Sequence, residues 1–141
     1  MKLVFGADDL SPTVDAVLEY LRTNNHTVEI VSSDQPWPSI AHGVARTVAD
    51  GQADFGIVMC WTGTGTAIAA NKVPGIRAAV AWEPWIAKNA RLWNDANVLA
   101  MSLKRIEPDM AVEITAAFLN EPTSEPEELK NIAMLENWQD I

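Results

Sequence analysis

The stretch that most constrains this chain runs from residue 54 to residue 72 and reads DFGIVMCWTGTGTAIAANK. It begins with an apolar run, Phe55–Met59, which ends on the only cysteine of the chain, Cys60. A glycine–threonine loop over residues 62–66 follows, and then a run of small residues over 67–72. This order predicts a buried strand, a tight loop and the start of a helix.

The loop and the helix start predict a concave site for an anion, because backbone N–H groups gather at such a junction. The thiol of Cys60 would stand at the mouth of that site, where positive potential favours the thiolate. The stretch therefore offers a base or nucleophile beside donors that can stabilise a negative oxygen. Taken alone, Cys60 is also compatible with a small buried hydrophobic residue, which is a common use of cysteine.

A nucleotide-binding interpretation of the same loop is open as well. Gly63 and Gly65 match the first two glycines of the dinucleotide fingerprint G-x-G-x-x-G, whereas Ile68 stands in place of the third. Glu83 lies roughly where a ribose-binding acid is expected in that fingerprint. This alternative predicts a shift in thermal stability when NAD or NADP is added.

Length and charge narrow the class of protein. A chain of 141 residues predicts one domain with a substantial core. No apolar run approaches the roughly 20 residues that span a bilayer, and the N-terminus does not resemble a signal peptide. A single cysteine cannot form an intrachain disulfide, which favours a reducing cytoplasm. Of the net charge of −9, residues 107–141 hold nine acids and one lysine, which disfavours nucleic acid and membrane partners.

Strand-like and helix-like segments alternate along the whole chain. The predicted strands cover residues 2–6, 26–31, 55–60, 76–81 and 98–102, and the predicted helices 13–24, 39–50, 67–72, 82–93, 108–119 and 127–137. This alternation predicts an α/β fold of three layers, a five-stranded parallel sheet with helices on both faces. Asp8, Cys60 and the loop over 62–66 would then meet at the C-terminal edge of the strands, where such sheets bind ligands. The last helix follows a proline-rich linker, and its apolar face suits a second subunit or its own domain equally.

These residues resemble the ribose-5-phosphate isomerase B / galactose-6-phosphate isomerase family. The family pattern is C-G-T-G-x-G-x-S-I-A-A-N-K, then P-G-I-R-A, then H-N-D-x-N-V-L. The matching segments are CWTGTGTAIAANK at 60–72, PGIRA at 74–78 and WNDANVL at 93–99. The likeness covers roughly residues 1–120 and implies a Rossmann-like homodimer, or dimer of dimers, with its active site at the subunit interface. It also implies interconversion of aldose and ketose sugar phosphates without a metal or other cofactor.

The resemblance implies a role for each matched residue. Cys60 would be the base that moves a proton between C1 and C2, and Thr62 would hydrogen-bond the reacting oxygens or shuttle their protons. The amides of residues 63–65 would hold the oxyanion of the enediolate. Trp37, in a loop predicted over 32–38, would flank the substrate as a lid or pack onto the core. The predicted substrate-binding residues are Asp8, Asp9, Trp37, Gly63, Thr64, Gly65, Trp93 and Asn94.

This chain departs from the family pattern at positions that bear on the choice of substrate. The family's Asp-His pair is Asp8-Asp9 here, so a phosphate-binding histidine is absent, and the histidine that opens the sugar ring is Trp93. The glycine after the cysteine is Trp61, and Lys104 matches an arginine of the family. An intact base and oxyanion site with these changes predict an isomerase for an open-chain or non-phosphorylated sugar. A tetrose 4-phosphate cannot close a furanose ring and would need no ring-opening group, but it would need a phosphate site, which the sequence does not show. The alternative is a non-catalytic member that binds a ligand or supports a partner subunit.

Overall fold

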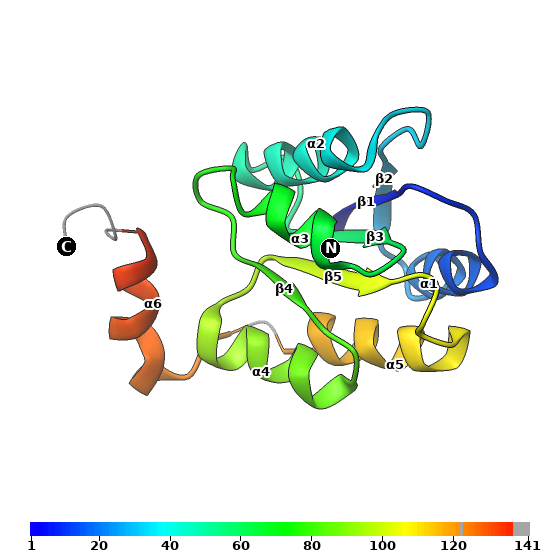
Figure 1. Ribbon diagram of the computed structural model, residues 1–141. Coiled ribbons are helices and arrows are strands. Elements are labelled where there is room, and N and C mark those ends of the chain that lie inside the picture. Colours follow the sequence, from blue (N-terminus) through cyan, green and yellow to red (C-terminus); the bar gives the residue numbers. More distant parts are fainter. Residues whose placement is uncertain (122, 137–141) are drawn as a thin grey trace.

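The computed structural model describes residues 1–121 and 123–136 and shows a parallel sheet with helices on both faces (Figure 1). The strands are β1 (Lys2–Ala7), β2 (Thr27–Ile30), β3 (Phe55–Cys60), β4 (Ala78–Val80) and β5 (Val98–Ser102). The helices are α1 (Pro12–Thr23), α2 (Trp37–Ala49), α3 (Thr64–Ala70), α4 (Pro84–Asn94), α5 (Pro108–Leu119), a 3₁₀ turn η1 (Pro126–Glu128) and α6 (Leu129–Glu136). All four strand pairings are parallel, in the order β2-β1-β3-β5-β4. The predicted five-stranded, three-layer α/β fold is confirmed.

Both faces of the central strands β1, β3 and β5 are buried, which explains why these strands are almost wholly apolar, whereas the edge strand β2 is largely exposed. Alternate residues of each strand point to opposite faces. Phe5, Ile57 and Met101 pack with helices α1, α4 and α5 on one face. Val4 and Val58 pack with α2 and α3 on the other face. Figure 1 shows these two helical layers above and below the strands.

Two predicted boundaries near the site were wrong. Trp37 was placed in a loop, but it is the first residue of α2, with Pro36 as the N-cap. Pro38 fits there because a proline in the first helical turn removes an N–H that has no helical partner. The predicted loop over 62–66 is also shorter, because α3 begins at Thr64.

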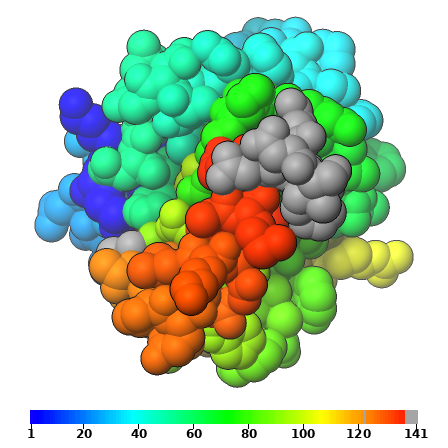
Figure 2. All heavy atoms as spheres, turned by 90° about the vertical axis from the view of Figure 1, so that its left-hand side faces the viewer, coloured from blue at the N-terminus to red at the C-terminus, as the bar shows by residue number. Residues whose placement is uncertain are grey.

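Helix α6 stands at the side of the domain, where it is the orange and red segment of Figures 1 and 2. Leu129, Met134 and Leu135 on this helix are 48–54% exposed. An ion pair of 2.8 Å between Arg77 Nη1 and Glu136 Oε1 joins its end to the segment before β4. The helix was predicted to continue to Asn137, which lies outside the described residues. No helix within the described part of the chain is long and apolar enough to cross a membrane.

Candidate active site

A cavity of about 330 Å³ lies at the C-terminal edge of β1 and β3. Its lining consists of Asp8, Trp37, Cys60, Trp61, Thr62, Thr64 and Gly65. Asp8 directly follows β1 and Cys60 ends β3. These two strands are neighbours in parallel, so the side chains that follow them meet at one edge. The structure therefore brings six of the ten predicted site residues to one cavity, whose use by a substrate stays a prediction.

The sulfur of Cys60 is held between two donors from the following turn. The Gly63 N–H donates to Sγ at 3.2 Å, and the hydroxyl of fully buried Thr66 donates at 3.4 Å. Burial raises the pKa of the Cys60 thiol, but hydrogen bonds from Thr66 and the loop amides outweigh it and leave the pKa below that of an ordinary thiol. Cys60 thus carries more thiolate at neutral pH than a free cysteine, and the thiolate is the reactive form.

Gly63 makes this turn possible because of its backbone conformation and its close packing. Its φ is 78°, in the left-handed region that glycine adopts without a steric penalty. A Cβ at this position would lie 2.8 Å from the carbonyl carbon of Met101 on β5. The hydroxyls of the neighbouring Thr62 and Thr64 also share a hydrogen bond, with 2.7 Å between the two Oγ1 atoms. The donation of the Gly63 amide to Cys60 supports the thiolate, while its predicted contact with an oxyanion stays a prediction.

Asp8 brings a carboxylate to the cavity. Its backbone N–H donates to the Met59 carbonyl at 3.2 Å, which fixes the residue beside the end of β3. Its Oδ1 is buried and accepts no hydrogen bond from the part of the chain that the structure describes. Burial, aided by the nearby charge of Asp9, raises the pKa of the Asp8 carboxyl above its usual value. Asp8 is one of the residues that line the cavity, and its contact with a substrate stays a prediction.

Asp9 is not among the residues that line the cavity. Its carboxylate instead accepts two hydrogen bonds beside the cavity. Oδ1 accepts the Leu10 N–H at 2.8 Å, and Oδ2 accepts the Trp61 indole N–H at 3.2 Å. The ammonium of Lys104 lies 4.4 Å from the centroid of the Trp61 ring. The sequence indicated neither contact, because nothing local joins residues that are more than forty positions apart.

Trp37 packs against a neighbouring helix and also lines the cavity, while its contact with a substrate stays a prediction. Its ring lies 3.1–3.3 Å from the position that a Cβ on Gly65 would take. The glycine thus lets the indole pack on the first turn of α3. The same residue lines the cavity and remains 43% exposed.

Trp93 and Asn94 lie away from Cys60 in this chain. They are at the end of α4, which leads to the N-terminal edge of β5, opposite to the edge that carries the cavity. The rings of Trp93 and Trp85 meet edge to face with centroids 5.6 Å apart, and the Trp93 indole donates to Glu125 at 3.1 Å. Asn94 lines another cavity, of about 440 Å³. Within one chain these two residues therefore cannot contact a substrate at Cys60.

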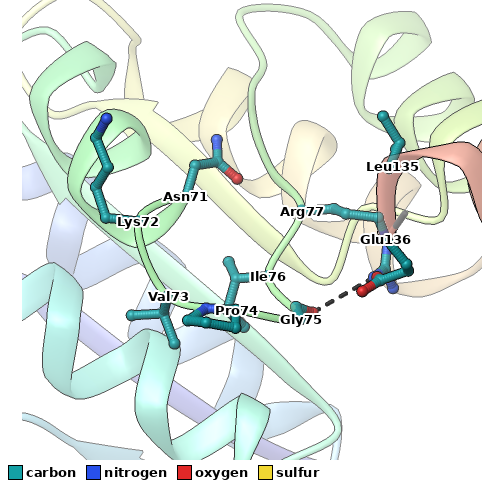
Figure 3. A pocket seen from close by; sticks show the side chains of 9 residues that line it. All are labelled: Asn71, Lys72, Val73, Pro74, Gly75, Ile76, Arg77, Leu135 and Glu136. Carbon is teal, nitrogen blue, oxygen red and sulfur yellow. Dashed lines mark hydrogen bonds and ion pairs between the residues drawn. The ribbon is translucent and has the colours of Figure 1, made fainter. Parts of the chain in front are cut away.

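Figure 3 shows a further cavity, of about 360 Å³, between the segment over 71–77 and the end of α6. Its Arg77 guanidinium donates to the Gly75 carbonyl at 3.4 Å and pairs with Glu136. Arg77 also pairs with Asp95 at 3.0 Å, so its charge is already balanced. Neither a thiol nor a histidine lines this cavity, whereas the cavity at Cys60 contains a thiol that accepts two hydrogen bonds. A fourth cavity, of about 660 Å³, shares Thr62 with the cavity at Cys60 and is also lined by Trp82 and Ser102.

The comparisons with known proteins agree with this geometry. Residues 4–135 match the family model described as Ribose/Galactose Isomerase. The chain is 35% identical over 126 residues to D-erythrulose-4-phosphate isomerase of Pectobacterium atrosepticum, covering 85% of this chain and 83% of that protein. It is 46% identical over 83 residues to ribose-5-phosphate isomerase B of Escherichia coli, covering 59% of this chain and 56% of that protein.

A solved structure extends the match to almost the whole fold. Ribose-5-phosphate isomerase B of Clostridium thermocellum superposes with a TM-score of 0.90 at 30% identity. The superposition covers 99% of this chain and 98% of that one. The predicted family and its isomerase class are confirmed, and the chain belongs to the ribose/galactose isomerase family.

Proposed function

We propose that this protein interconverts an aldose and a ketose, with Cys60 as the base that moves the proton. The observation that carries the proposal is the Cys60 sulfur, which accepts hydrogen bonds from Gly63 and Thr66 in a cavity that is also lined by Asp8. Bases and acids of this kind are effective when their pKa lies near the working pH, and the pKa of Cys60 is shifted in that direction.

The proposed step is a balanced proton transfer. The Cys60 thiolate removes the proton from C2 of the open-chain aldose, and the electron pair moves into an enediolate. The resulting thiol returns the proton to C1, while the proton on the C2 oxygen moves to the C1 oxygen. Thr62 lines the same cavity and is proposed to relay the oxygen-bound proton, and Asp8 is proposed to hold a substrate hydroxyl. No redox partner is consumed.

The preferred substrate class is a small sugar phosphate that does not need ring opening. One fact from the sequence supports it: a tryptophan stands at position 93, where the family pattern has the histidine that opens the sugar ring. The similar protein of Pectobacterium atrosepticum is named for D-erythrulose 4-phosphate, a sugar of this kind. The unpaired Cys60 suits a reducing compartment, and we place the protein in the cytoplasm.

The test is deuterium incorporation from D₂O, followed by NMR, with phosphorylated and free aldoses and ketoses of four to six carbons. We expect deuterium at C1 or C2 of at least one sugar, at a rate proportional to enzyme. A folded protein that labels none of the sugars would overturn the proposal and favour the alternative of a non-catalytic partner subunit. Stabilisation by NAD or NADP in a thermal melt would instead favour the nucleotide-binding alternative.

We also propose that the protein is a homodimer in which each site takes Trp93 and Asn94 from the partner chain. In one chain these residues lie at the opposite edge of the sheet from Cys60, so only a second chain can bring them to it. Closed two-fold dimers are the commonest symmetric assembly and would form two equal sites. Light scattering measures the mass of the assembly and therefore also tests whether two such dimers associate.

Mixing two inactive variants tests the shared site. Cys60→Ala and Asn94→Ala are each expected to lose activity, while a co-expressed equal mixture regains about a quarter of wild-type activity through heterodimers. The regained activity should elute with a dimer in size-exclusion chromatography with light scattering. A mixture as inactive as its components, in a sample that contains heterodimers, would place each site within one chain.

A further inference from the structure

Trp61 is exposed, yet its indole is held from two directions. The side chain is 58% exposed, and a tryptophan so placed on a loop would normally be free to change rotamer. Here its N–H donates to Asp9 at 3.2 Å, and the Lys104 ammonium lies 4.4 Å from the ring centroid. Cations over a tryptophan face are attracted by the negative potential of the ring.

The Asp9 carboxylate that accepts the indole N–H is itself held in place, and so is the backbone of Trp61. The Leu10 N–H and the Trp61 N–H both donate to Asp9 and lower the pKa of its carboxyl, so Asp9 remains an acceptor at neutral pH. The backbone of Trp61 is also tied, because its carbonyl accepts the hydroxyl of Ser102 at the end of β5. Backbone and indole are therefore anchored to two segments of the chain, the one that follows β1 and the one at the end of β5.

Trp61 is one of the residues that line the cavity that contains Cys60. The other large ring there, Trp37, is set by its packing against Gly65. Two anchored tryptophans therefore lie among the residues that line this cavity, and one of them stands where the family pattern has a glycine, which narrows the space beside Cys60. Aromatic side chains also offer the flat apolar surface on which the carbon side of a short sugar can lie.

We propose that Trp61, positioned by Asp9 and Lys104, sets the chain length of the substrate and favours four-carbon over five-carbon sugar phosphates. This inference rests on the proposed isomerase function. Asp9 and Lys104 act here as positioning residues, and Trp61 as the residue that contacts the substrate. A glycine stands at this position in the family pattern, so the selectivity would be a property of this chain.

The test compares kcat/KM for D-erythrulose 4-phosphate and D-ribulose 5-phosphate. Neither ketose can close a five-membered ring, so ring opening does not enter the comparison. We expect the wild type to favour the four-carbon ketose, and Trp61→Ala to reduce the ratio of the two kcat/KM values by at least about tenfold. The control is Ile30→Ala, because Ile30 is a large apolar residue that is 51% exposed at the end of β2 and lines none of the cavities described above. Its ratio should equal that of the wild type.

Variants of Asp9 separate positioning from general loss of structure. Asp9→Asn keeps an oxygen that can accept the indole N–H and should retain the wild-type ratio, whereas Asp9→Leu should shift it toward that of Trp61→Ala. The Trp61 indole N–H resonance, assigned by its loss in Trp61→Phe, should exchange faster with solvent in Asp9→Leu only. An unchanged ratio in Trp61→Ala with turnover retained would overturn this inference alone. No turnover of any sugar by the wild type would overturn the proposed function and this inference with it.

Discussion

Replacement of Cys60 by serine is expected to lower the rate of isomerisation about a thousandfold, with little change in stability. Serine is close to cysteine in size and can accept the same hydrogen bonds from Gly63 and Thr66. Its hydroxyl is a far weaker acid than a thiol, so almost no anion is present at neutral pH to remove the C2 proton. The measurement is deuterium incorporation at C2, with urea unfolding to verify the fold.

The pH dependence of the alkylation of the Cys60 thiol is a second, independent test of its role as the base. Because the pKa of the thiol is lowered in the folded protein, the thiolate forms at lower pH than in an unfolded cysteine peptide. The rate of alkylation by iodoacetamide should therefore rise and level off at lower pH than for free cysteine, and substrate should slow it. Thr66→Val removes one donor to the sulfur without changing the size of the side chain, so it should move the profile to higher pH. A Cys60→Ser variant as active as the wild type, or a thiol inert to alkylation in folded protein, would remove Cys60 from the mechanism.

Replacement of Gly63 by alanine is expected to destabilise the protein by about 3 kcal/mol or more. Two penalties combine at this position. An L-residue at a φ of 78° pays the cost of the left-handed region, and its Cβ would lie 2.8 Å from the Met101 carbonyl carbon. Because the contact is with backbone of a central strand, it is relieved only by moving the loop, which would also displace the Gly63 amide from Cys60.

Gly51→Ala is the matched control for this prediction. Gly51 has a φ of 75°, but nothing lies within 4 Å of a Cβ placed there. It therefore carries the backbone penalty alone, roughly 1 kcal/mol. Urea unfolding at one pH measures both variants. Equal losses in the two variants would mean that the contact with β5 contributes nothing.

The sequence alone determined most of the architecture, because the information is local. The apolar runs and the glycine and proline positions specify where strands and helices begin, and the alternation of the two specifies a parallel sheet. Parallel strands end at one edge, so the meeting of Asp8 with Cys60 followed from the order of elements. The motif from Cys60 to residue 72 was specific enough to identify the family from the residues themselves.

Only the tertiary structure decided how the side chains around Cys60 pair. The contacts of Asp9 with Trp61 and of Trp61 with Lys104 join residues that are far apart in sequence. The packing of Trp37 on Gly65 depends on how α2 lies against α3. Such contacts depend on the relative positions of whole elements, which a pattern of period 2 or 3.6 does not encode. The sequence likewise named Trp93 as a site residue without saying where it lies relative to Cys60, whereas the fold places it at the opposite edge of the sheet.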